Sequence, residues 1–200
     1  GLDLASKVDL AAVEYLFPPL EDGEPWVRFG DYYLPQATVE LTENEHYRTW
    51  QKEGWLTVTE GNMIDFWTIR DDILQAAAMF SVQDIAYDPN QATMLVNSLQ
   101  DEGLTLVEVR PLVLNFSEPM KTMDGLILSG LYRHSGDPVM AWAISNTVAK
   151  VDAKDNVYPR KDHAAKKIDP VVAHLMALAR ALRQEGDDGG AGFFKNPVRA

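Results

Sequence analysis

The sequence predicts an α/β fold in which helices flank a mixed central sheet. Two patterns support this prediction: three extended segments open the chain, and extended and helical segments alternate after residue 81. Strands that alternate with helices at this spacing are typical of parallel pairing within one sheet. With 200 residues, 46% of them apolar, the chain is long enough to bury the core of a single domain.

The opening segments have the pattern of strands. Leu2 and Leu4 alternate with polar residues, the run 10–17 is mostly apolar, and the polar turn 6–9 joins them, as in a hairpin. The stretch 26–35, WVRFGDYYLP, is rich in aromatic residues and ends in proline. We therefore expect a hairpin followed by a third strand.

Helices and strands then follow each other to residue 183. Thr42 and Glu45 have capping-box spacing, so a helix should begin there and end at Gly54. The other expected elements are an extended segment over 55–60, helices over 64–80, 89–103, 117–130 and 170–183, strands over 82–88 and 104–111, and a helix leading into a hairpin over 139–159. This order is that of a ribonuclease-H-like fold of the integrase type. We place this domain at 1–185 and a flexible, glycine-rich tail at 186–200.

Composition excludes several kinds of site and partner. Because the chain has no cysteine, disulfides, thiolate zinc sites and cysteine nucleophiles are excluded. No apolar run approaches the ~18 residues of a membrane helix, and no basic-then-apolar leader is present. We therefore expect no membrane partner.

The charge is unevenly distributed. The net charge is −12, yet residues 1–108 hold 5 basic and 20 acidic residues, whereas residues 109–200 hold 13 basic and 10 acidic ones. The stretch Lys150–Lys167 has six basic residues and three acidic ones. An acidic chain does not suit general coating of nucleic acid, but a local basic stretch can contact a phosphate backbone. A solvated hairpin and helix start is the alternative explanation of this stretch.

Three aspartates occupy positions that the predicted topology brings to one edge of the sheet. Asp3 lies in the first strand, Asp88 ends a later central strand, and Asp169 opens the last long helix. Three neighbouring carboxylates repel one another unless cations bind them, and hard cations such as Mg²⁺ and Mn²⁺ prefer oxygen ligands. Two such ions ~3.5–4 Å apart can activate a water for phosphodiester cleavage.

Each aspartate also has a purely structural explanation. Asp3 could be the solvent-facing residue at a strand end, because strand faces alternate. Asp88 and Asp169 each precede a proline, which is the pattern of a helix N-cap with proline at the first helical position. Capping is the favoured explanation for Asp88 and for Asp169 when each is considered alone. The metal-site explanation gains support because one topology brings both of them to the same edge of the sheet as Asp3.

Three ordered stretches carry a family resemblance: GLDLASKVDLAAV, VQDIAYDPNQATMLVNSLQDEG and GLYRHSGDPVMAWAISNTVAKVDAKDNVYPRKDHAAKKIDPVVAHLMAL. Together they resemble the nuclease domain of the large terminase subunit of tailed bacteriophages, over residues 1–183 and most weakly through 40–65. The resemblance implies a ribonuclease-H-like domain that cuts concatemeric viral DNA. It places the family's metal-binding acids on Asp3, Asp88 and Asp169.

Other positions match the family pattern as well. Asp9 matches a recurring acidic position, although we favour turn formation there. His134 and Asn146 also match, and we expect both to be structural hydrogen bonders. Pro170 stands where the family often has a small residue, which could move Asp169 slightly.

The resemblance also implies partners. They are double-stranded DNA, the ATPase domain of the same large terminase, the small terminase subunit and the portal protein, in the host cytoplasm at the packaging complex. This chain has no Gly-Lys pair and therefore no phosphate-cradling GxxxxGK[ST] loop. We expect an excised or separately made nuclease domain without ATPase activity.

The resulting hypothesis is a metal-dependent DNA endonuclease that uses two divalent cations, Mg²⁺ or Mn²⁺. Asp3 would bridge the two ions, and Asp88 and Asp169 would each complete one coordination shell. An activated water would attack the phosphorus in line, leaving a 5′-phosphate and a 3′-hydroxyl.

Four basic residues near the late helix are candidates for DNA contacts: Arg160, Lys161, Lys166 and Lys167. Solvated side chains are the alternative for each. Sequence preference should be weak, because nothing resembles a base-reading helix module. Two other functions stay open: a junction-resolvase-type nuclease with the same fold, and a docking module that holds DNA or a packaging partner without cutting.

Overall fold

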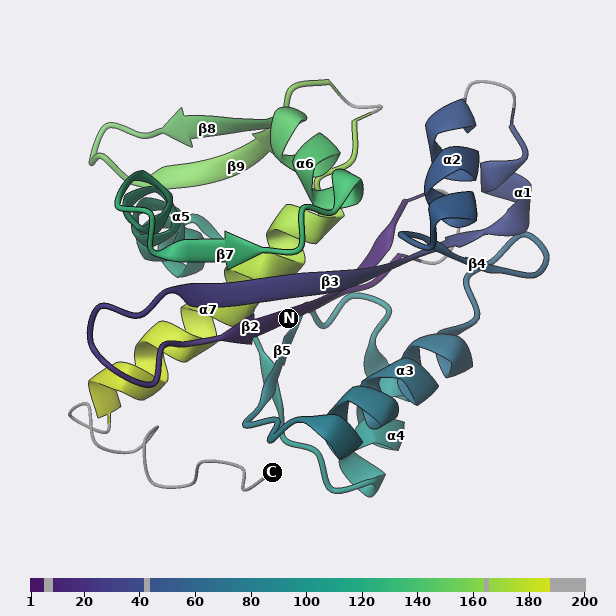
Figure 1. The fold of residues 1–200 in the computed structure, drawn as a ribbon, viewed down its shortest axis with the longest axis horizontal. Helices are drawn as coiled ribbons and strands as arrows, with labels where there is room; N and C mark the ends of the chain where they lie inside the picture. The colour runs from purple at the N-terminus through teal and green to yellow at the C-terminus, as the bar shows by residue number, and fades with distance from the viewer. Residues whose placement is uncertain (6–8, 42–43, 164–165, 188–200) are drawn as a thin grey trace.

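A mixed sheet with helices on both faces forms the body of the protein, and a separate two-stranded hairpin stands beside it (Figure 1). The structure is a computed structural model that describes residues 1–5, 9–41, 44–163 and 166–187. The predicted class, an α/β fold with a mixed central sheet, is confirmed. No helix of the described residues is long and apolar enough to cross a membrane.

The main sheet has seven strands in the order β4-β3-β2-β1-β5-β6, with β7 also paired to β3. The strands are β1 (Leu2–Asp3), β2 (Ala11–Phe17), β3 (Trp26–Pro35), β4 (Thr57–Thr59), β5 (Ile85–Tyr87), β6 (Leu106–Glu108) and β7 (Tyr132–His134). The pairs β1–β2 and β2–β3 are antiparallel, and the pairs β1–β5 and β5–β6 are parallel. The predicted opening hairpin and the parallel βαβ pairing are thus confirmed, and β1 lies inside the sheet.

Seven helices and the hairpin complete the described part of the chain. They are α1 (Gln36–Val39), α2 (Glu45–Glu53), α3 (Phe66–Met79), α4 (Thr93–Asp101), α5 (Val113–Leu128), α6 (Pro138–Ser145), α7 (Asp169–Asp187), and the antiparallel strands β8 (Thr147–Val151) and β9 (Val157–Lys161). Asp155, in the predicted hairpin turn, has a φ of 59°. Aspartate is one of the few residues besides glycine that occupy this left-handed region.

The two faces of the sheet bury alternate residues of the same strands. On one face, Val13 and Tyr33 belong to a core with residues of α3 and α4. On the other face, Ala12 and Tyr32 belong to a core with residues of α2, α5, α6 and α7. In Figure 1, α3 and α4 accordingly lie below β3, whereas α5 and α6 lie above it. The alternation seen in the sequence therefore results in two helical layers.

Several boundaries differ from those predicted. The helix α2 begins at Glu45 with Asn44 as its N-cap residue, and Asn44 makes no side-chain cap bond, so the predicted start near Thr42 is too early. Thr42 itself lies outside the described residues. Gly54 ends the helix as expected, with a φ of 81°. The helix α5 begins at Val113 rather than at 117, and it includes Pro119, which lacks the N–H that would bond the carbonyl four residues back.

Two short elements, α1 and β7, were not predicted. The strand β7 has three residues, two of them exposed, so it carries no alternating apolar pattern. It exists because it pairs with the first residues of β3. The last helix, α7, begins at Asp169 and continues through Gly186 to Asp187. The rest of the predicted tail, 188–200, lies outside the described residues.

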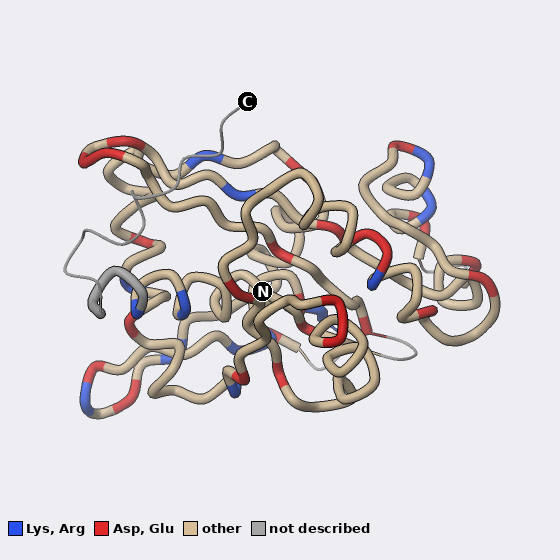
Figure 2. Tube along the Cα trace, turned by 90° about the horizontal axis from the view of Figure 1, so that it is seen from below, with Lys and Arg blue, Asp and Glu red and all other residues tan. Residues whose placement is uncertain are grey.

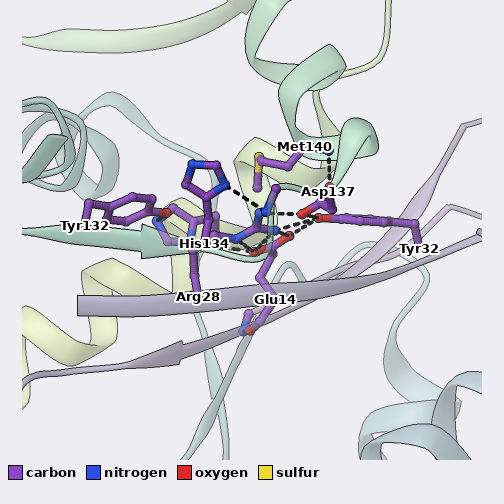
Figure 3. A network of polar contacts seen from close by, with 10 residues as sticks. Glu14, Arg28, Tyr32, Tyr132, His134, Asp137 and Met140 are labelled. Carbon is purple, nitrogen blue, oxygen red and sulfur yellow. Dashed lines mark hydrogen bonds and ion pairs between the residues drawn. The ribbon is translucent and has the colours of Figure 1, made fainter. Parts of the chain in front are cut away.

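A buried guanidinium group joins the sheet to α6 (Figure 3). Arg28 of β3 is 2% exposed. It donates hydrogen bonds to Glu14 of β2 from Nε (3.0 Å) and from Nη2 (2.6 and 2.8 Å), and from Nη1 to Asp137 Oδ2 (2.6 Å). Tyr32 OH donates to Glu14 Oε1 at 2.7 Å. Asp137 Oδ1 accepts from Met140 N at 2.6 Å and so caps α6.

The same network reaches β7 and α7. His174 of α7 is fully buried, with Nδ1 3.8 Å from Glu14 Oε2 and Nε2 3.0 Å from Tyr132 OH of β7. Burial and the neighbouring Arg28 lower the pKa of His174 to about 3, so it is neutral. Burial raises the pKa of Glu14 to about 7, although Arg28 opposes this shift. The network therefore links β2, β3, β7, α6 and α7, and within it Arg28 neutralises two buried carboxylates, those of Glu14 and Asp137.

Arg28→Met is expected to lower the free energy of unfolding by about 3–5 kcal/mol, because Glu14 and Asp137 would stay buried without their cation. Urea unfolding followed by circular dichroism measures this change. Arg110→Met is the matched control, because Arg110 pairs with Glu108 on the exposed surface; it should change little. A loss for Arg28→Met as small as that for the control would contradict the central role of Arg28.

Candidate active site

Asp3 and Asp88 lie side by side at the same edge of the sheet. The parallel pair β1–β5 places Leu2 opposite Tyr87, and Asp88 N donates to Leu2 O at 3.4 Å. Asp3 follows Leu2 and Asp88 follows Tyr87, so the two aspartates lie opposite each other at the carboxyl ends of the two strands. Because neighbouring strands in register point their side chains to the same face, the two carboxylates are adjacent.

Asp169 reaches this edge from the start of α7, which packs against β1, β2 and β5. Its Oδ2 is buried and has no hydrogen-bond partner among the described residues. Burial raises the pKa of Asp169 to about 6, although Lys161 and Lys167 favour the ionised form. An unpartnered carboxylate oxygen in a buried position is costly, which makes it a candidate ligand for a cation.

Electrostatic interaction links the three carboxylates. The pKa of Asp3 is raised well above its usual range, first by burial and then by the charges of Asp169 and Asp88, while Lys161 opposes the shift. The structure therefore places Asp88 and Asp169 within electrostatic range of Asp3. Like charges held this close favour protonation or the binding of cations.

Two of the four candidate DNA-contacting residues lie at the same place. Lys167 Nζ donates to Asp9 Oδ1, and Lys161 Nζ lies 3.9 Å from the same oxygen. Arg160 is exposed and, as the neighbour of Lys161 in β9, points to the opposite face of the hairpin. Lys166 lies nearer α2: burial of His46 lowers the pKa of that imidazole, and the charge of Lys166 lowers it further. Asp9 is thus an ion-pair partner of two lysines. The rest of its predicted turn, 6–8, lies outside the described residues.

Helix capping does not account for Asp88. The N-cap residue of α4 is Ala92, whereas Asp88 Oδ1 accepts from Asn90 N at 3.2 Å within the preceding turn. Asp169 is the first residue of α7. The helix dipole favours a carboxylate at that position, so part of its placement is structural.

The two further family-matched residues are structural, as expected. His134 is exposed, and its Nδ1 accepts from Gly136 N at 3.1 Å in the turn before α6. Asn146 is buried, and its Nδ2 donates to Lys167 O at 3.1 Å. Neither side chain belongs to the group of three carboxylates.

Sequence reasoning missed Tyr47 of α2. It is buried and packs with the rings of Trp50 and Trp142. Burial raises its pKa, with further contributions from Asp169 and Asp9, so α2 borders the site. The aromatic residues of 47–50 were the available signal, but such a pattern usually indicates core packing alone.

Carboxylate oxygens are the side-chain donors that this edge of the sheet offers to a metal. No three Asp, Glu or His side chains lie close enough together to coordinate one metal ion in their present conformations, among residues 1–5, 9–41, 44–163 and 166–187. The donor chemistry fits hard divalent cations, which bind carboxylates and keep several waters. Asp3, Asp88 and the unpartnered oxygen of Asp169 are therefore the residues that could hold them.

Comparison with known proteins gives consistent matches. The family model described as "Terminase large subunit, endonuclease domain" matches residues 1–185. "Protein YmfN" of Escherichia coli K12 is 34% identical over 199 residues, covering 94% of this chain and 44% of that protein. The "Terminase, large subunit" of Enterobacteria phage HK97 is 29% identical over 195 residues, covering 95% of this chain and 38% of that protein. The chain thus spans less than half the length of these relatives.

Two crystal structures share the fold. The large terminase of bacteriophage HK97 superposes with a TM-score of 0.76 and 28% identity, covering 90% of this chain and 38% of that one. The large terminase nuclease of thermophilic phage G20c superposes with a TM-score of 0.57 over 90% of this chain and 80% of that one. At 10% identity, this second likeness concerns the fold alone. The ribonuclease-H-like class predicted from the element order is confirmed.

The raised pKa of Asp169 predicts how stability depends on pH in EDTA. The folded protein holds this proton up to about pH 6, whereas the unfolded chain releases it near its usual pKa of 3.8. The stability due to this group is complete below about pH 4 and is lost as the pH rises through about 6. Asp169→Asn should remove roughly 1–3 kcal/mol of that decline, measured by urea unfolding between pH 4 and pH 8.

Asp101→Asn is the control for this measurement, because Asp101 is an exposed carboxylate at the end of α4. It should leave the pH profile as it is in the wild type. Identical pH profiles for Asp169→Asn and the wild type would contradict a raised pKa of Asp169 in the folded protein.

Proposed function

The chain belongs to the endonuclease-domain family of the terminase large subunit, and we propose that it is a metal-dependent endonuclease that cuts concatemeric double-stranded viral DNA during genome packaging. Membership in this family implies a nuclease role in phage DNA packaging. The observation that carries the finer proposal is the convergence of Asp3 in β1, Asp88 just after β5 and Asp169 at the start of α7. Burial raises the pKa of both Asp3 and Asp169, and the charges of Asp169 and Asp88 raise that of Asp3 further.

Each of these carboxylates has a proposed role. Asp3, whose charge interacts with those of both other aspartates, would help to hold both of two divalent cations, Mg²⁺ or Mn²⁺, and Asp88 and Asp169 would each hold one of them. When bound, such ions supply an activated water and neutralise the leaving oxygen of the phosphodiester. The chain itself then needs no side-chain nucleophile, in agreement with the absence of cysteine. The products would carry a 5′-phosphate and a 3′-hydroxyl.

The lysines beside the carboxylates would orient the DNA. Lys161 and Lys167 both approach Asp9, so each ammonium group already lies at the rim of the site. A phosphate there could take over from Asp9 as their partner. Arg160 and Lys166 are proposed to contact the backbone farther along. Acidic positions recur along much of the described trace and basic ones are fewer (Figure 2), so DNA should approach at this local basic stretch.

The remaining functions of the packaging machine fall to partners. We propose that residues 1–185 act as the nuclease domain beside the ATPase domain of the same large terminase, together with the small terminase subunit and the portal protein. The site of action would be the packaging complex in the host cytoplasm. This proposal is supported by the relatives being more than twice as long as this chain. Residues after Asp187, where α7 ends, are proposed to lie outside the catalytic domain.

Asp3→Asn should abolish cleavage, with a loss of at least about 100-fold, because the bridging charge is removed. The measurement is nicking and linearisation of supercoiled plasmid with Mn²⁺, Mg²⁺ or EDTA. Asp84→Asn is the matched control, since Asp84 precedes β5 at its other end and pairs with Arg180; it should cut like the wild type. EDTA should stop all cleavage.

Other outcomes of this experiment decide between functions. Preference for a branched substrate over linear duplex would favour the junction-resolvase type. Binding of DNA without cleavage in any metal would favour the docking module. Equal cutting by Asp3→Asn and the wild type would exclude the proposed role of the carboxylates.

The double variant Lys161→Ala, Lys167→Ala should weaken binding of duplex DNA and make it less dependent on salt. If each lysine contacts one phosphate, the slope of log affinity against log salt should fall by about 2. Fluorescence anisotropy of a labelled duplex from 50 to 200 mM NaCl measures this slope. Lys52→Ala, on the exposed face of α2, is the control, and a slope equal to its slope would contradict the proposed contacts.

A further inference from the structure

One buried residue ties together both ends of the connection between β9 and α7, through its backbone at one end and its side chain at the other. Asn146 follows α6 as its C-cap residue and is 1% exposed. Its backbone O accepts from Asp162 N at 3.0 Å, just after β9. Its side-chain Nδ2 donates to Lys167 O at 3.1 Å, just before α7. The two bonds hold the beginning and the end of this connection to a single residue.

The connection delivers the residues of the site. Lys161 lies at its beginning, and Lys167 and Asp169 lie at its end. The far end of α6 is capped by Asp137, which is bonded to the buried Arg28. The position of Asn146, and through it that of the backbone before Asp169, is therefore set by a helix anchored to the sheet.

The amide of Asn146 is not explained by packing. Its Oδ1 is buried and has no hydrogen-bond partner among the described residues. A buried, unsatisfied acceptor is destabilising, and an apolar side chain of similar shape would avoid that cost. Asn146 therefore supplies a donor for Lys167 O while its own unsatisfied Oδ1 lowers the stability of the fold. A local loss of stability of this kind is typical of functional sites.

We propose that Asn146 is a positioning residue: its Nδ2 bond to the Lys167 carbonyl holds the start of α7 so that the Asp169 carboxylate faces Asp3. It touches neither the DNA nor the cations of the proposed reaction. The inference rests on the proposed function, because the geometry that it protects is that of the cation-binding carboxylates. Loss of the bond should weaken cation binding while leaving the fold intact.

Asn146→Leu tests this proposal most sharply. Leucine keeps the branched shape and removes both the donor and the unsatisfied acceptor, so the thermal midpoint in EDTA should be close to that of the wild type. Binding of Mn²⁺, measured by isothermal titration calorimetry, should be about tenfold weaker, as expected when the hydrogen bond that orients a ligand is lost. Asn146→Ala should weaken it similarly and serves as the second variant.

Ser117→Ala is the matched control. Ser117 is also buried, and its Oγ accepts from Val157 N at 3.1 Å, which fixes the start of β9 at the end of the strand away from Asp169. Ser117→Ala removes one side-chain bond to the β8–β9 hairpin and should leave Mn²⁺ affinity within twofold of the wild type. Equal affinity for Asn146→Leu and the wild type, or equal losses for Asn146→Leu and Ser117→Ala, would overturn the proposal.

The two levels of inference fail differently. If the wild type binds Mn²⁺ and cuts plasmid but Asn146→Leu does both equally well, only the positioning role is wrong. If the wild type neither binds Mn²⁺ nor cuts, the proposed function and the positioning role fail together.

Discussion

The guanidinium group of Arg28, buried between the carboxylates of Glu14 and Asp137, is the interaction on which the rest of the structure depends. Desolvating these three charges is expensive, and the cost is offset only while every hydrogen bond is made. Asp137 then caps α6, and Glu14 faces His174 of α7. The sheet, α6 and α7 are thereby fixed relative to one another.

This arrangement matters because the candidate site is assembled from separate elements. Asp3 and Asp88 are held by strand pairing, which leaves their backbones little freedom. Asp169 and the two lysines depend on α7 and on the connection before it. The buried network and Asn146 add to the direct packing of α7 on the sheet in positioning this second half of the site. Without a bound cation, Lys161 and Lys167 provide the positive charge near the carboxylates.

Features that rest on local pattern could be predicted from the sequence. The strand Trp26–Pro35 is found at its predicted bounds because its aromatic residues and final proline are local signals. Asp3 and Asp88 meet because parallel strands end at one edge, a consequence of topology alone. The start of α2 and the strand β7 were missed, since neither a side-chain cap nor an apolar alternation marks them.

Features that rest on distant contacts could not be predicted. Arg28 stands in WVRFGDYYLP where a surface residue of an alternating strand would stand. Its partner Asp137 is 109 positions away in the sequence. Tyr47 of α2 lies within electrostatic range of Asp169 and Asp9, but its sequence pattern is that of an ordinary core aromatic residue. The sequence predicted Lys161 and Lys167 as candidate DNA contacts, but it did not predict that both lysines approach Asp9.

The central claim is that three carboxylates from β1, β5 and α7 form one cation-binding site. Crystals of the protein grown with Mn²⁺ test it directly through an anomalous difference map. We predict two peaks about 3.5–4 Å apart, with Asp3 in contact with both and with Asp88 and Asp169 on either side. Peaks elsewhere, or no peak at these residues at saturating Mn²⁺, would contradict the claim.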